Sequence, residues 1–143
     1  MPDHRSMSKL PNLAGLCVLV IDDDDDARAT IAATLHHAGA TMTSAAAGDH
    51  ALDDLTQFLP DVVICDLRMP RLDGVAFIRT LQARAPEHGG RIPVIGITAY
   101  FEVYTDGEAA QLGFAAFLPK PLDLERLCRV VESVCRGAGQ PTR

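Results

Sequence analysis

LCVLVIDD, residues 16–23, is the stretch that decides the fold, because a short continuous apolar run ends there abruptly in acidic residues. Such a run, from Leu16 to Ile21, is typical of a strand that is buried on both faces in a parallel sheet. Asp24 or Asp25 can cap the helix that follows, since carboxylates accept hydrogen bonds from the free N–H groups of a first turn. The segment therefore predicts one β-strand that leads directly into one α-helix.

The same order of a strand and then a helix recurs four more times along the chain. Further strands are predicted at residues 41–46, 61–65, 92–97 and 115–118, each with a helix after it, at residues 49–58, 75–85, 103–112 and 124–135. Five such units without a hairpin signal predict a parallel sheet with helices on both faces. The expected fold class is therefore α/β, a flavodoxin-like (βα)5 single domain with strand order 2-1-3-4-5.

The domain boundaries follow from where this pattern begins and ends. Residues 1–15 are polar and interrupted by prolines, so we assign them to an N-terminal tail or linker. The domain itself is assigned to residues 16–136, and residues 137–143 are assigned to a C-terminal tail.

The composition is that of an ordinary globular protein, and it restricts the expected partners. The 143 residues suit one domain and carry a formal net charge of −6. Because binding to nucleic acid needs a basic surface, no direct contact with nucleic acid is expected. No apolar run is long enough to cross a bilayer, so we expect no membrane insertion and a cytoplasmic location. The four cysteines show no C-x-x-C pairing, which favours free thiols over zinc ligands.

Polar side chains follow four of the predicted strands, at the point where each strand ends. Asp22 and Asp23 follow the first strand, Asp66 the third, Thr98 the fourth and Lys120 the fifth. The carboxyl ends of parallel strands meet at one edge, and clustered carboxylates there repel each other unless a cation lies among them. Mg²⁺ suits such oxygen ligands, with Asp23 and Asp66 as the first choices. A carboxylate can also attack phosphorus, with an ammonium and a hydroxyl group to balance the charge.

Four ordered motifs make the chain resemble a known family. They are Val18–Asp23, Asp61–Gly74, Ile97–Ala99 and Lys120-Pro121. In this set and order they resemble the bacterial response-regulator receiver family, over residues 16–136. The resemblance implies a domain of a two-component phosphorelay that takes a phosphoryl group from a histidine kinase or a histidine phosphotransfer protein. The amino-acid sequence around these motifs is most similar to that of receivers of hybrid histidine kinases.

The resemblance also implies a role for each matching residue. Asp66 matches the phosphoacceptor, and Asp22 and Asp23 match the acidic pair that serves Mg²⁺. Thr98 matches the switch hydroxyl group, and Lys120 matches the lysine that pairs with the phosphoryl group. These assignments make Mg²⁺ the expected cofactor.

Three further positions carry implied properties. The backbone carbonyl of Arg68 matches a metal ligand, and the side chains of Arg68 and Tyr100 occupy positions that tune the phosphoryl lifetime. The Lys120-Pro121 peptide matches one that is commonly cis. Phe117 matches the switch aromatic residue in the fifth strand, where many members have tyrosine.

Three functions remain as hypotheses. The main one is a phosphorylation-driven switch that remodels the surface of helix 4, strand 5 and helix 5, rather than a conventional enzyme. The second is a phosphohydrolase with an aspartate nucleophile, suggested by the Asp22-x-Asp24 pattern. The third is a docking module that works without phosphorylation.

Overall fold

A five-stranded parallel sheet forms the centre of the protein, in the order β2-β1-β3-β4-β5. The computed structural model describes residues 10–67, 73–85, 87, 89–99 and 111–136. The strands are β1 (Cys17–Ile21), β2 (Thr41–Ala45), β3 (Val62–Asp66), β4 (Val94–Thr98) and β5 (Ala116–Pro119). The predicted flavodoxin-like strand order is thereby confirmed.

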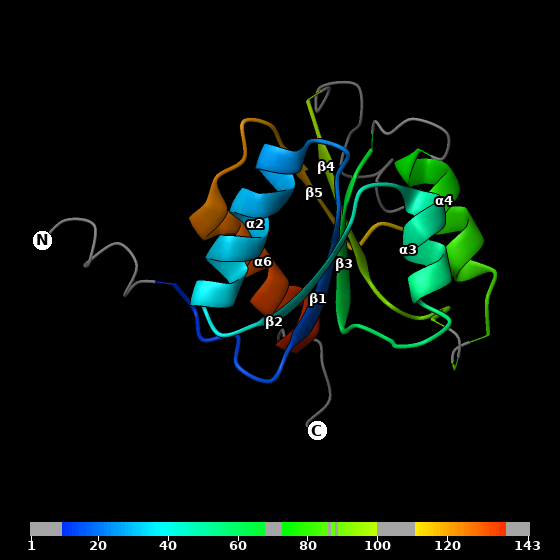
Figure 1. Cartoon of the computed structure of the whole chain (residues 1–143), viewed down its shortest axis with the longest axis horizontal. Coiled ribbons are helices and arrows are strands. Elements are labelled where there is room, and N and C mark those ends of the chain that lie inside the picture. The colour runs from blue at the N-terminus through cyan, green and yellow to red at the C-terminus, as the bar shows by residue number, and fades with distance from the viewer. Residues whose placement is uncertain (1–9, 68–72, 86, 88, 100–110, 137–143) are drawn as a thin grey trace, which may run out of the picture.

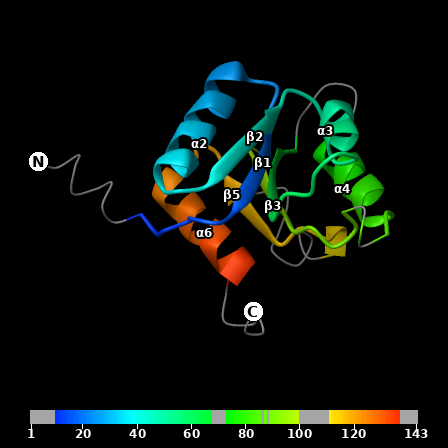
Figure 2. The same ribbon diagram turned by 60° about the horizontal axis from the view of Figure 1, so that its bottom comes forward.

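Helices cover both faces of this sheet, as predicted. Those described are α2 (Asp25–His37), α3 (Gly48–Asp54), α4 (Gly74–Gln82) and α6 (Leu124–Arg136). Helices α2 and α6 lie on one face, and α3 and α4 lie on the other (Figures 1 and 2). Most of the predicted helix at 103–112 lies outside the described residues, although its last two residues, 111 and 112, are helical.

Alternate residues of β1, an inner strand of the sheet, point into two separate cores. Val18 and Val20 of β1 join the core under α2 and α6. Leu19 and Ile21 join the core on the opposite face, with residues of α3 and α4. Because both faces are covered, every position from Val18 to Ile21 has to be apolar, which explains the continuous run in the sequence.

Two predicted helices end earlier than expected. Helix α3 ends at Asp54 instead of residue 58, and the Thr56 hydroxyl group donates a hydrogen bond to the Asp53 carbonyl 2.7 Å away. Helix α4 ends at Gln82, three residues before the predicted end at residue 85. Both corrections concern turns in which local hydrogen bonds satisfy the last carbonyl groups of the helix.

The N-terminal boundary of the packed unit also needs correction. Leu13, which the sequence placed in a tail, is fully buried in the core between α2 and α6. Its amide donates to the Ala38 carbonyl over 2.8 Å. The Arg136 side chain at the end of α6 donates from Nη1 to the Asn12 carbonyl over 2.8 Å and from Nη2 to the Ala14 carbonyl. Residues 10–15 therefore form a strap that packs on the domain.

Candidate functional site

Three aspartates converge at the carboxyl edge of the sheet. One oxygen from each of Asp22, Asp23 and Asp66 lies within 4.8 Å of the others. The register explains the convergence, because Ile21 of β1 pairs with Cys65 of β3 and an aspartate comes directly after each of these two residues. Asp22 and Asp66 are 1% and 5% exposed, whereas Asp23 is exposed. Two of the three charges are thus held almost out of water.

The Asp22 carboxylate is only partly satisfied by the protein. Its Oδ1 accepts a hydrogen bond from the Asp24 amide at 2.9 Å. Its Oδ2 is the one buried side-chain nitrogen or oxygen, among the described residues, that lacks a hydrogen-bond partner. Burial is the main reason that the pKa of Asp22 is raised, and the neighbouring charge of Asp66 adds to the effect. An orphaned oxygen beside two further carboxylates fits a hard divalent cation such as Mg²⁺.

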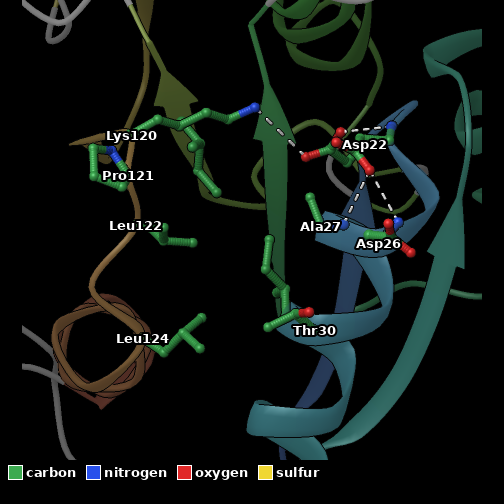
Figure 3. Close-up of a pocket in the computed structure, with 11 residues that line it drawn as sticks. Asp22, Asp26, Ala27, Thr30, Lys120, Pro121, Leu122 and Leu124 are labelled. Atoms are coloured by element: carbon green, nitrogen blue, oxygen red, sulfur yellow. Dashed lines mark hydrogen bonds and ion pairs between the residues drawn. The ribbon is translucent and has the colours of Figure 1, made fainter.

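The Lys120 ammonium group lies at the same site. Its Nζ is 3.1 Å from Asp66 Oδ2 and 3.9 Å from Asp22 Oδ2, and Figure 3 shows the side chain reaching across toward Asp22. Burial acts to lower the pKa of Lys120, but the hydrogen bond to Asp66 and the charges of both aspartates outweigh it, so the pKa is raised. The group therefore stays cationic where an incoming anion would need it.

Strand β4 brings Thr98 to the same edge. Thr98 is 1% exposed, and its carbonyl accepts the Lys120 amide at 2.9 Å. The preceding residue, Ile97, pairs with Asp66 across the β3–β4 ladder. The predicted convergence of these residues at one edge is confirmed. Arg68 and Tyr100 lie outside the described residues.

Two features in β5 and directly after it concern the expected switch. The Lys120–Pro121 peptide is cis, as the resemblance implied. Phe117 is 6% exposed, and its ring centroid lies 4.9 Å from that of Phe114. Both rings belong to the core that contains residues of α3 and α4. The aromatic side chain that matches the family's switch residue is thus buried.

A groove opens beside the acidic cluster and was not predicted. It encloses about 340 Å³ between the first turns of α2 and the connection from β5 to α6. Ala27 and Thr30 line one wall, and Leu122 and Leu124 line the other (Figure 3). In the sequence, these four residues look like ordinary helical or loop residues. The groove could not be predicted because it depends on where the β5–α6 connection lies in space.

Comparison with known proteins places this geometry in a family. Residues 18–132 match the family described as the response regulator receiver domain. One curated relative is the DNA-binding transcriptional regulator NtrC of Escherichia coli (strain K12), 36% identical over 115 residues, which are 80% of this chain and 24% of NtrC. Another is NtrC of Klebsiella pneumoniae, 34% identical over 113 residues, 79% of this chain and 23% of that protein. The chain therefore spans about a quarter of the length of these relatives.

Solved structures give the same result. The receiver domain of a Francisella response regulator superposes with a TM-score of 0.76 at 27% identity, covering 85% of this chain and 98% of that one. The receiver domain of a sensor histidine kinase from Pseudomonas aeruginosa PAO1, which has a magnesium ion in its active-site cleft, gives 0.75 at 29% identity, covering 85% and 98%. The chain belongs to the response regulator receiver domain family of two-component signalling.

Proposed function

We propose that this domain accepts a phosphoryl group on Asp66 from the phosphohistidine of a histidine kinase or histidine phosphotransfer protein, with Mg²⁺ as cofactor. The observation that carries the proposal is the position of the Lys120 ammonium, 3.1 Å from Asp66 Oδ2 and beside the Asp22 carboxylate. A lysine that only neutralised a surface charge would not lie beside two buried carboxylates. Asp22 is 1% exposed and Asp66 is 5% exposed.

The reaction that we propose is a displacement at phosphorus. A carboxylate oxygen of Asp66 forms the new P–O bond while the P–N bond to the donor histidine breaks, and the histidine nitrogen keeps the electron pair. The Lys120 ammonium and the Thr98 hydroxyl group then balance the charge on the phosphoryl oxygens. The backbones that carry these two side chains are held next to each other, because the Lys120 amide donates a hydrogen bond to the Thr98 carbonyl.

The residues that would hold the metal are Asp22, Asp23, Asp66 and the backbone carbonyl of Arg68. When bound, Mg²⁺ would neutralise the carboxylates and the transferring phosphoryl group. Asp22 presents its unpartnered Oδ2 toward this cluster, and Asp23 is exposed, so its carboxylate is open to solvent ligands. The likeness to a receiver with magnesium in its active-site cleft supports this assignment.

The output that we propose is a change of surface. Phosphorylation draws Thr98 and Phe117 toward the phosphorylated site, which remodels the surface of helix 4, strand 5 and helix 5. Much of that surface lies outside the described residues, but Phe117 itself is described and is 6% exposed. A partner that binds the remodelled surface then shifts the population toward it.

Mass spectrometry after incubation with acetyl phosphate and Mg²⁺ tests the phosphoacceptor. We expect one added phosphoryl group on Asp66 in the wild type and none in Asp66→Asn. Asp53→Asn is the matched control, because Asp53 is an exposed aspartate of α3, and it should be phosphorylated as the wild type is. A stable phosphoryl group on Asp66→Asn, or on another aspartate of the wild type, would contradict the proposal.

The phosphohydrolase hypothesis gains no support from the geometry. Its second aspartate, Asp24, is the N-cap of α2, and its Oδ1 accepts the amides of Asp26 and Ala27 at 2.9 and 3.2 Å. A carboxylate committed to capping a helix is poorly placed to act as a general acid. The docking hypothesis would be favoured only if the domain failed to bind Mg²⁺.

A further inference from the structure

The Arg28 side chain reaches back from the first turn of α2 to the loop that carries the acidic pair. Its Nη1 donates a hydrogen bond to the backbone carbonyl of Asp22 over 2.7 Å, and its Nη2 donates to Asp25 Oδ1 over 2.6 Å. The Arg28 side chain is 20% exposed, whereas that of Asp25 is 85% exposed. The contact with the Asp22 carbonyl is therefore the better shielded of the two.

Three polar groups of Asp22 have hydrogen-bond partners. Its amide donates to the Ala45 carbonyl over 3.2 Å, and its Oδ1 accepts the Asp24 amide at 2.9 Å. Its carbonyl is the third, and it accepts from Arg28 Nη1. The first two partners are backbone groups, so the bond from Arg28 is the one of the three that a substitution at another position can remove.

The carbonyl that Arg28 holds belongs to the peptide group between Asp22 and Asp23. A peptide group is planar, so a hydrogen bond to its oxygen also fixes the direction of its N–H and the place where the next residue begins. Asp23 is exposed, so packing constrains it less than it constrains the buried Asp22. The direction of this peptide group therefore decides where the Asp23 carboxylate can lie.

We propose that Arg28 is a positioning residue for the metal ligands. By holding the Asp22 carbonyl, it fixes the peptide group between Asp22 and Asp23 and so keeps both carboxylates in the three-aspartate cluster. This inference rests on the Mg²⁺ site of the proposed function. Arg28 is not itself a ligand, since a guanidinium group carries only hydrogen-bond donors.

Helix stability does not account for this arginine. Arg28 and Asp25 are three residues apart, and an exposed pair at this spacing contributes little. A cation in the first turn also faces the positive end of the helix dipole, which is unfavourable. The ion pair explains the position of Nη2, but Nη1 is directed at a carbonyl that lies outside the helix, six residues away in sequence.

Charge alone predicts the opposite effect on metal binding. A cation near the carboxylate cluster repels Mg²⁺, so replacing Arg28 with a neutral residue would tighten Mg²⁺ binding if charge were its only influence. If Arg28 positions the ligands, the same replacement weakens binding, because the carboxylates lose their common orientation. The direction of the change therefore distinguishes the two roles.

The first experiment measures the Kd of Mg²⁺ for the unphosphorylated domain, from amide chemical shifts at matched ionic strength. Arg28→Gln should bind Mg²⁺ about tenfold more weakly than the wild type, as is typical when a group that orients metal ligands is lost. Arg129→Gln is the matched control, because it removes the same charge from the Arg129–Glu125 ion pair of α6, and its Kd should equal that of the wild type. Equal or tighter binding by Arg28→Gln would overturn the proposal.

Two further variants separate the geometry of Arg28 from its charge. Arg28→Lys keeps the charge, but one ammonium replaces the fork that bonds two partners, so its Mg²⁺ affinity should be lower than that of the wild type. Asp25→Asn removes a charge and keeps an oxygen that can accept from Nη2, so its Kd should change by less than about twofold. A loss of affinity in Asp25→Asn as large as that in Arg28→Gln would refute the positioning role. If Arg28→Gln fails to fold, Arg28→Lys replaces it, and wild-type affinity in that variant refutes the proposal.

The second experiment reports on the loop in the absence of Mg²⁺. Hydrogen exchange at the Asp24 amide, which bonds Asp22 Oδ1, should be faster in Arg28→Gln than in the wild type. Exchange at the Ala27 amide, which bonds Asp24 Oδ1 at the start of α2, should be unchanged. Equal acceleration at both amides would mean that Arg28 only stabilises the start of the helix, contrary to the proposal.

The third experiment separates this inference from the proposed function. Phosphorylation of Asp66 by acetyl phosphate is followed over a series of Mg²⁺ concentrations. Arg28→Gln should need about tenfold more Mg²⁺ to reach half of its maximal rate, and at saturation it should approach the rate of the wild type. A lower maximal rate with an unchanged Mg²⁺ requirement would refute the positioning role. If the wild type is not phosphorylated on Asp66, the proposed function fails, while the Kd of Mg²⁺ and the exchange at Asp24 still decide the role of Arg28.

Discussion

The Lys120 ammonium donates a hydrogen bond to Asp66 Oδ2 over 3.1 Å, across 54 residues of sequence. Lys120 follows β5 and Asp66 is the last residue of β3, and these two strands are separated by β4 in the sheet. Lysine reaches over the end of β4 because its long side chain starts beside Thr98. The contact shows that the site exists only in the folded sheet.

Removing this ammonium should slow phosphorylation of Asp66. Lys120→Met keeps an unbranched apolar side chain but removes the charge that would stabilise the phosphoryl oxygens. We expect the rate with acetyl phosphate to fall by about 100-fold, measured by mass spectrometry over time. Arg129→Met is the control, since that cation lies on the exposed side of α6 in an ion pair with Glu125. Equal rates for Lys120→Met and the wild type would refute the role of Lys120.

Neutralising Asp22 should make the domain more stable near neutral pH. The pKa of Asp22 is raised in the folded state, so its proton is bound more tightly there than in the unfolded chain. Stability from this group is therefore greatest below its unfolded pKa, is lost as the pH rises through the folded pKa, and stays lost above it. Asp22→Asn removes that loss, and we expect about 1 kcal/mol of added stability at pH 7 without Mg²⁺.

Thermal unfolding at two pH values checks this prediction. The difference in Tm between Asp22→Asn and the wild type should be positive at pH 7 and should shrink near pH 3. Asp25→Asn serves as the control, because the Asp25 side chain is 85% exposed. A lower Tm for Asp22→Asn at pH 7 would show that the charge is better satisfied than its unpartnered Oδ2 suggests.

Mg²⁺ should reverse the order of stability of the wild type and Asp22→Asn. A ligand that binds only the folded state stabilises it, by roughly 1.4 kcal/mol when its free concentration is about ten times the Kd. We expect MgCl₂ to raise the Tm of the wild type and to have little effect on Asp22→Asn, which has lost one carboxylate of the cluster. Ionic strength must be matched with NaCl, so that screening of the three aspartates is the same in both series. An equal Mg²⁺ response in both proteins would remove Asp22 from the ligand set.

The sequence predicted that Asp22, Asp66 and Lys120 lie together because these residues stand at the ends of short apolar strands. A parallel sheet brings such ends to one edge, whatever the details of the helices. The pairing of Gly96 with Phe117 could not be predicted in this way. It depends on the register of β4 and β5, and register is not visible in one sequence.

The strap of residues 10–15 was missed for a different reason. Leu10 and Leu13 stand among Pro11, Asn12 and Gly15, so they form neither a helical nor a strand period. Their burial depends on a long-range contact with α6, which only the folded chain reveals.

That contact yields a prediction about stability. The Arg136 guanidinium bonds the carbonyls of Asn12 and Ala14, and it joins the strap to the last residue of α6. Arg136→Ala should cost about 1 kcal/mol, seen as a fall in Tm of about 3 to 6 °C. Arg129→Ala, on the same helix but in an ion pair with the partly exposed Glu125, should cost less than about 0.5 kcal/mol.

The two variants separate the strap from ordinary surface charge. Both remove one arginine from α6, so the net charge and much of the change in helix propensity are matched. If the strap packs as described, Arg136→Ala should also speed hydrogen exchange at the Leu13 amide, which bonds the Ala38 carbonyl, while Arg129→Ala should not. Equal losses of Tm and equal exchange at Leu13 would mean that the strap holds to the core through Leu13 burial alone, without help from Arg136.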